Sequence, residues 1–224
     1  ERRRPVLRHY DVPLSTLSTP MLRSHHRMAK VLHFSDLHLF AGQEFLLDFL
    51  QEIRDTEQFD YVISTGDNFG SPDALEMVIQ AHEIFSAAYL RTMGWADLSN
   101  SSALVEPYQT ETTTDVDEFS YAPAPLALLG VDDPHINRDS ITGLSQSWLS
   151  SGAIRMGVTH APYTRVLDSM THLGAEVILA GHTHGGQIGL PGVTSLVTNC
   201  DLPREFGKGL HVWETSASEN AWLH

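Results

Sequence analysis

Four short apolar segments of this sequence each end at a polar motif that contains Asp or His. They have the length of buried β-strands and comprise residues 31–34, 61–63, 156–159 and 177–180. Between them, residues 43–57 and 162–173 carry apolar side chains at helical spacing. Because strands that alternate with helices favour parallel β-α-β units, the pattern predicts an α/β fold around a mostly buried sheet.

Further elements follow from the same reading. A helix is expected to begin at Ser71 and Pro72, which supply an N-cap and a first-turn proline, and to run past Ile84. Residues 109–118 are polar and are interpreted as a loop. Additional strands are expected at residues 126–131, 193–197 and 210–213.

No internal repeat or linker divides the chain, so we expect one domain over residues 30–224, behind an extended arm at residues 1–29. The first 30 residues hold seven basic and two acidic side chains, whereas the remainder holds seven basic and 26 acidic ones. Because the chain after residue 30 is so acidic, it should repel nucleic-acid phosphates, and no nucleic-acid partner is expected. The basic arm could make a peripheral membrane contact, or it could be a solvated tail.

The location of the protein is open between the cytoplasm and a membrane surface. The single cysteine, Cys200, excludes an internal disulfide framework and fits a reducing compartment. No apolar run approaches the roughly 20 residues that span a bilayer. The chain begins at Glu1 and ends just after the apolar residues 221–223, so both ends are expected to be cut, and an upstream signal or anchor would not be visible.

Six side chains with metal-binding groups lie at the expected strand ends: Asp36, His38, Asp67, His160, His182 and His184. The C-terminal ends of parallel strands share one rim, so these side chains should meet in space. Two carboxylates and four imidazoles make a poor core, because the buried anions repel each other and lose hydration. Divalent cations relieve both problems, and this ligand set without cysteine suits Mn, Fe, Zn or Co rather than a structural zinc site.

Each motif also has a simpler interpretation. An Asp-x-His triplet is common by chance, Gly-Asp is primarily a turn signal, and His160 could be a hydrogen-bonded core residue. The i,i+2 spacing of His182 and His184 among glycines is harder to explain that way, since alternate side chains of an extended segment face one side. The four motifs in this order therefore favour a metal site.

Three residues near the same rim are weaker candidates for contact with a substrate. Asp133 and His135 follow the strand expected at 126–131, although a proline-containing turn capped by Asp explains them better. Asn68 could touch a phosphate oxygen or could stabilise the turn beside Gly66 and Asp67.

The order of the motifs resembles that of the calcineurin-like metallophosphoesterase superfamily, in particular a bacterial branch with membrane- or wall-associated members. The resemblance covers the chain from about Val31 to its end and rests on the strings SDLHL, TGDN, GVDDP, THAPY and GHTHGGQ. It implies a four-layer α/β/β/α sandwich with two facing mixed sheets flanked by helices. It also implies two metal ions: the first held by Asp36, His38 and His184, the second by His160 and His182, with Asp67 bridging them.

One motif of the superfamily is not found. Its Gly-Asn-His-Asp/Glu sequence, whose Asn ligates the second metal and whose His assists the leaving group, has no match between Asn68 and His160. Ala81-His82-Glu83 resembles this motif only superficially, because it lies within a helical pattern rather than after a strand. We therefore expect that a stretch is missing from the sequence near residues 84–90, and no catalytic protein side chain is assigned.

The predicted activity is hydrolysis of a phosphomonoester or phosphodiester by a hydroxide that bridges two metal ions. The expected partner is a small-molecule or lipid-linked phosphate ester. The alternative is a non-catalytic scaffold that keeps this fold and binds a protein partner.

Overall fold

The first two strands form a small sheet of their own in the computed structural model, which describes residues 5–14, 28–89, 95–107, 123–142, 148, 152–184 and 198–224. Strands β1 (Val31–Phe34) and β2 (Tyr61–Ser64) pair in parallel, with Val31 opposite Tyr61. Leu39 and Phe69 extend this pairing by one isolated parallel bridge. The segments that follow β1 and β2 therefore leave the small sheet side by side.

Two helices cover one face of the small sheet. They are α1 (Glu44–Thr56) and α2 (Leu75–Tyr89), and a short 3-10 turn, η2 (Pro72–Ala74), leads into α2. Leu32 and Phe34 of β1 point to this side and share a core with Leu50 of α1 and Phe85 of α2. Alternate residues of a strand face opposite sides, so the other face of β1 and β2 is left for a different partner.

That partner is a six-stranded mixed sheet with the strand order β3-β4-β5-β6-β8-β7. Strands β4, β5, β6 and β8 run parallel, while β3 and β7 are antiparallel edge strands. The strands are β3 (Ser101–Val105), β4 (Leu126–Gly130), β5 (Ile154–Thr159), β6 (Val177–Ala180), β7 (His211–Glu214) and β8 (Asn220–Leu223).

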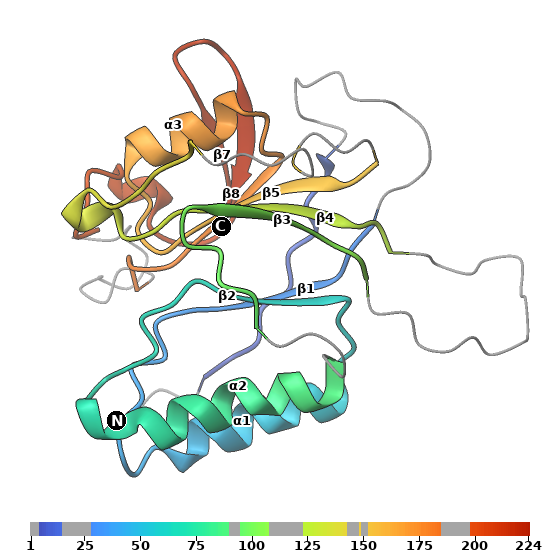
Figure 1. Cartoon of the computed structure of the whole chain (residues 1–224), viewed down its shortest axis with the longest axis vertical. Helices are drawn as coiled ribbons and strands as arrows, with labels where there is room; N and C mark the ends of the chain where they lie inside the picture. Colours follow the sequence, from blue (N-terminus) through green and yellow to red (C-terminus); the bar gives the residue numbers. More distant parts are fainter. Residues whose placement is uncertain are drawn as a thin grey trace, which may run out of the picture.

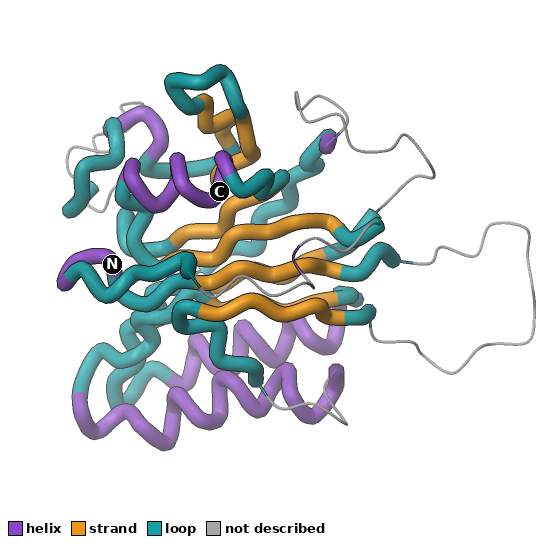
Figure 2. Tube along the Cα trace, turned by 45° about the horizontal axis from the view of Figure 1, so that its top comes forward, coloured by secondary structure: helices purple, strands orange, loops and turns teal. Residues whose placement is uncertain are grey.

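Apolar side chains fill the space between the two sheets. Tyr61 and Ile63 of β2 share a core with Leu128, Met156 and Leu179 of the larger sheet. On the far side of that sheet, α3 (Thr164–His172) packs through its buried Val166, Leu167 and Met170. Figure 1 shows the resulting order from α1 and α2 through β1 and β2 and the larger sheet to α3, and Figure 2 shows the strands side by side between helices.

The predicted mixed α/β architecture is confirmed, with two strands that the sequence reading missed. β3 begins with two serines and β8 begins with Asn220, so each has only three consecutive apolar residues. Both become strands through pairing with their neighbours in the larger sheet: β3 pairs with β4, and β8 pairs with β6 and β7. The strand expected at 193–197 and the loop at 109–118 lie outside the described residues.

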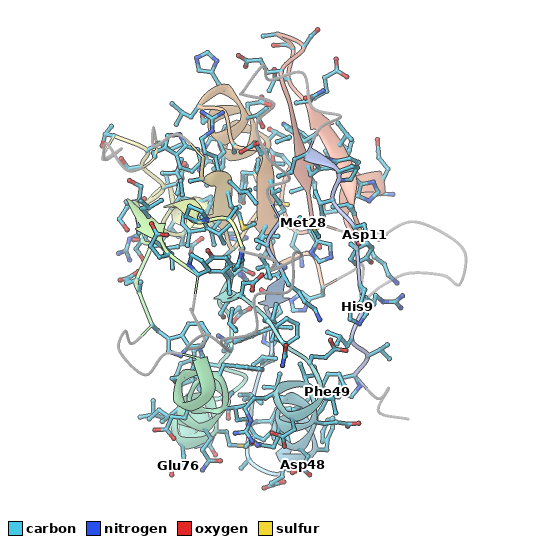
Figure 3. The ribbon with its side chains drawn as sticks, turned by 90° about the vertical axis from the view of Figure 1, so that its right-hand side faces the viewer. His9, Asp11, Met28, Asp48, Phe49 and Glu76 are labelled. Atoms are coloured by element: carbon cyan, nitrogen blue, oxygen red, sulfur yellow. The ribbon has the colours of Figure 1, made fainter. Side chains whose placement is uncertain are left out.

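The segment before β1 packs on the domain where the structure describes it. Leu7 contacts the core beneath α1, and Trp222 Nε1 of β8 donates to the carbonyl oxygen of Pro13 at 3.3 Å. In Figure 3, Asp48 and Glu76 lie on the outer sides of α1 and α2, and Phe49 lies on the side of α1 near His9. None of the helices among the described residues has the length and apolar character needed to cross a bilayer.

Helix α2 is continuous as far as Tyr89, and residues 90–94 lie outside the described residues. The single domain at 30–224 and the stretch expected to be missing near 84–90 stay predictions.

Candidate metal centre

Backbone hydrogen bonds tie together the loops that carry the four motifs. The amide of Asp36 donates to Gly66 O at 2.9 Å, which joins the loops after β1 and β2. The amide of Gly181 donates to His160 O at 2.9 Å, which joins the loops after β5 and β6. The amide of His182 donates to Asp36 Oδ2 at 2.9 Å, so the two pairs of loops also meet each other.

Five of the six expected ligands have left-handed backbone conformations. Their φ angles are 53° for Asp36, 43° for His38, 50° for Asp67, 68° for His182 and 52° for His184. A side chain with a Cβ atom adopts this region at a free-energy cost on the order of 1 kcal/mol or more for each residue. Such strain persists only where the surrounding structure enforces it, and it concentrates at functional sites.

Four side chains form one compact group. One ligand atom from each of Asp36, His38, Asp67 and His184 lies within 4.8 Å of the corresponding atoms of the other three. His38 Nε2 is 3.3 Å from Asp67 Oδ2 and 3.3 Å from His184 Nε2. These atoms come from three loops, and all of them are of the oxygen and nitrogen types that bind divalent transition metals.

The buried oxygen Asp36 Oδ1 tests whether this group fits a cation. It accepts no hydrogen bond from any described residue, and the nearest ring nitrogens, His184 Nε2 and His160 Nε2, are 3.6 and 3.9 Å away. A buried carboxylate oxygen without a hydrogen bond is strongly destabilising unless a cation compensates its charge. The residues therefore fit a metal ion among Asp36, His38, Asp67 and His184.

His160 lies beside this group with its orientation set by the backbone. Its Nδ1 is 3.1 Å from the carbonyl oxygen of Thr65. A carbonyl oxygen only accepts, so Nδ1 carries the proton and Nε2 presents its lone pair toward Asp36 Oδ1. Metal-binding histidines usually make such a bond through their other ring nitrogen.

His182 is held in a similar way. Its Nε2 lies 3.2 Å from the carbonyl oxygen of Asn199 and 2.9 Å from His135 Nε2. Burial lowers the pKa of His182 below its usual value, which favours the neutral ring that metal binding requires. The ring centroids of His182 and His160 are 5.3 Å apart.

Among the described residues, no second group of three such side chains is as compact as the first.

A cavity of about 730 Å³ opens beside these residues. Its lining includes Asp67, His160 and His182, together with Asp133 and His135. No Lys or Arg is present among its described lining residues, so the charge that could attract a phosphate there would come from bound cations.

The weaker candidates occupy structural positions. Asp133 caps the 3-10 turn η3 (Pro134–Ile136), as the turn interpretation predicted. Asn68 is buried and donates through Nδ2 to Ser64 Oγ at 3.1 Å, which stabilises the loop after β2. Substrate contact by either residue stays a prediction.

Sequence reasoning missed two backbone groups that contribute to the site. The carbonyl groups of Thr65 and Asn199 fix the histidine rings, and a backbone carbonyl leaves no signal in the residue type. Gly181, by contrast, is recognisable in the sequence as a glycine that lets the backbone turn tightly before the His-Thr-His motif. A Cβ atom there would collide with Ser35 Oγ and Asp36 Oδ2, so only glycine allows this close approach.

Comparisons with known proteins identify the family of the chain. A family model described as calcineurin-like phosphoesterase matches residues 29–186, which is more than half of the chain. Over 91 residues the chain is 38% identical to the uncharacterized metallophosphoesterase YkoQ of Bacillus subtilis (strain 168). That match covers 40% of this chain and only 32% of YkoQ. No solved structure matches the chain significantly. The matched region contains all six expected ligands, and the chain belongs to the calcineurin-like phosphoesterase family.

Proposed function

We propose that the protein hydrolyses a phosphomonoester or phosphodiester with the help of two divalent metal ions. The observation that carries this proposal is the compact group around Asp36, whose Oδ1 is buried without a hydrogen bond from any described residue. Membership of the phosphoesterase family supports the class of reaction.

The ligands divide into two sets in this proposal. Asp36, His38 and His184 would hold one ion, His160 and His182 would hold the other, and Asp67 would be shared between them. When bound, the ions neutralise charge on the phosphoryl oxygens and lower the pKa of a coordinated water. The ligand chemistry is compatible with Mn, Fe or Zn.

The protein's own part is to hold these ligands rigidly. Thr65 O accepts from His160 Nδ1, and Asn199 O accepts from His182 Nε2, so each ring keeps one tautomer. The amide of His182 donates to Asp36 Oδ2, which fixes this carboxylate from the opposite loop. Ligands that are already ordered need little rearrangement when a metal or substrate binds.

We also propose that the complete fold is the four-layer sandwich typical of the family. The support comes from three separate apolar cores, which lie between α1–α2 and the small sheet, between the two sheets, and between the larger sheet and α3. This arrangement places the loops after β1, β2, β5 and β6 along one edge.

The substrate that we propose is a small-molecule or lipid-linked phosphate ester. The chain carries a net charge of −14, which disfavours a nucleic acid. A peripheral membrane contact through the basic residues before β1 would suit a lipid-linked substrate.

The test compares purified wild type with Asp67→Ala and Asp55→Ala in the presence of Mn²⁺, on generic monoester and diester substrates. Asp55 is an exposed acid on α1 and serves as the matched control. We expect hydrolysis by wild type and Asp55→Ala. We expect a loss of at least about 100-fold in Asp67→Ala, because without the shared carboxylate the ions that stabilise charge in the transition state would not be held. Equal rates for wild type and Asp67→Ala, or no hydrolysis with any divalent metal, would contradict the proposal.

A non-catalytic scaffold is the second candidate, because the Asn-containing motif of the superfamily has no match in the sequence. Elemental analysis after purification separates the two. About two metal ions for each chain would favour the enzyme, and metal-free protein would favour the scaffold.

A further inference from the structure

We propose that Asp133 and His135 form a positioning pair that orients His182 for metal binding. This inference rests on the proposed function, because it assigns a role to residues that support one of the proposed metal ligands through hydrogen bonds. His135 belongs to the loop that follows β4, whereas His182 belongs to the loop that follows β6.

The pair is held together within η3. Asp133 Oδ1 accepts from the backbone amide of His135 at 2.9 Å and lies 3.0 Å from His135 Nδ1. Burial opposes ionisation of Asp133, but the amide and ring of His135 outweigh it and lower the pKa of the carboxyl group. The carboxylate is therefore ionised near neutral pH and accepts the Nδ1 proton of His135.

The proton positions along the chain of contacts then follow from one backbone carbonyl. Asn199 O only accepts, so His182 Nε2 carries a proton. The same N–H faces His135 Nε2 at 2.9 Å, and His135 can accept there because its own proton is on Nδ1. The contacts therefore run from the Asp133 carboxylate through the His135 ring to the His182 ring. They leave His182 Nδ1 as the ring atom whose lone pair is available to a metal.

His135 is itself held in place, as a positioning residue must be. Its ring makes edge contacts with His182, at a centroid distance of 4.2 Å, and with Tyr163, at 5.3 Å. Arg165 of α3 donates to the carbonyl oxygen of Pro134 at 2.8 Å, which anchors the turn that carries the ring. The only ring nitrogen of His135 that can accept faces His182, so orientation of His182 explains this arrangement better than contact with a substrate.

Residues that hydrogen-bond to a metal ligand typically contribute about 10–100-fold to metal affinity. The experiment is a titration of the metal-free full chain with Mn²⁺, followed by calorimetry, for wild type, His135→Ala, His135→Gln and His172→Ala. We expect His135→Ala to weaken one class of Mn²⁺ site by about 10–100-fold and to leave the other class unchanged. Gln places an amide oxygen near the position of Nε2 and can accept from His182, so His135→Gln should remain within about threefold of wild type.

His172→Ala is the matched control. His172 is also a histidine paired with a carboxylate, Glu219 Oε2 at 3.2 Å, but it lies exposed on α3, and its removal should leave both classes of site unchanged. The inference is wrong if His135→Ala binds both ions like wild type, or if His135→Gln is as weak as His135→Ala. Far-UV circular dichroism of the metal-free variants verifies that each one is folded, and His135→Gln supplies the comparison if His135→Ala is not.

Failure of this inference is distinguishable from failure of the proposed function. A wild type that binds Mn²⁺ but hydrolyses nothing contradicts the proposed function alone, and the affinity comparison still decides the role of His135. A wild type that binds no Mn²⁺ contradicts both.

Discussion

The imidazole rings of His38 and His184 stack with their centroids 4.8 Å apart and their Nε2 atoms 3.3 Å apart, although the two residues are separated by 146 positions in the sequence. Zinc–nitrogen bonds of about 2.0–2.1 Å in a tetrahedral site place two ring nitrogens roughly 3.3 Å apart. The pair therefore has the spacing of two ligands on one ion, and Asp36 and Asp67 supply carboxylates beside it.

Metal binding should stabilise the folded protein against heat. A ligand present at 100 times its dissociation constant adds about 2.7 kcal/mol to the free energy of unfolding. For a chain of this size that corresponds to about 5–10 °C in the unfolding midpoint. Thermal unfolding of wild type with Mn²⁺ and with excess chelator should show this difference, and His184→Ala should lose most of it. A midpoint that does not respond to chelator in wild type would contradict a metal site.

Gly181→Ala should abolish metal binding, because the added methyl group displaces Asp36 Oδ2 and Ser35 Oγ. Gly157→Ala is the matched control, since its Cβ would meet the flexible Met170 Sδ at 2.6 Å on the α3 side of β5. Overpacking there should lower the free energy of unfolding by about 1–3 kcal/mol without loss of metal. Metal content of the two purified variants decides the matter: retention of metal by Gly181→Ala would show that the close approach is not required.

Phe85→Ala should destabilise the protein by about 3–5 kcal/mol, because Phe85 of α2 is fully buried beneath the small sheet. Ile79→Ala on the same helix should change the free energy of unfolding by less than about 1 kcal/mol, since Ile79 is 45% exposed. Urea unfolding measures both. Equal effects would mean that α2 does not pack as described, which would agree with a stretch missing from this part of the sequence.

Acid should destabilise the protein partly through His33. Burial, followed by the nearby His224, lowers the pKa of His33 in the folded state to about 3. The folded and unfolded states are both neutral at this position above about pH 6.5, and below it only the unfolded state gains a proton. Stability should therefore fall with decreasing pH, by up to about 1.4 kcal/mol for each pH unit, until the pH approaches about 3.

The variant His33→Gln isolates this contribution. Its free energy of unfolding should decline less steeply than that of wild type between about pH 6.5 and pH 4. His172→Gln changes an exposed histidine and should keep the wild-type slope. Identical slopes for wild type and His33→Gln would show that His33 is not kept neutral by the fold.

The strand ends and the four side chains of the compact group could be predicted because both depend on local pattern. Val31–Phe34 and Val177–Ala180 are short apolar runs that stop at polar motifs, and the structure has strands with these bounds. The contact between His182 and His135 could not be predicted, because it joins the loops after β6 and β4. Strand β8 was missed for a related reason, since its four residues become a strand only by pairing with β6 and β7.

The sequence by itself determined the mixed α/β architecture, the family and the six candidate ligands, since hydrophobic periodicity and the spacing of Asp, His and Gly are local properties. The tertiary structure alone decided how those ligands are held. The strained backbone at Asp36, the bonds from histidine rings to Thr65 O and Asn199 O, and the placement of His135 all depend on backbone atoms and on loops distant in the sequence. Such contacts arise only when packing of the two sheets brings those loops to one edge.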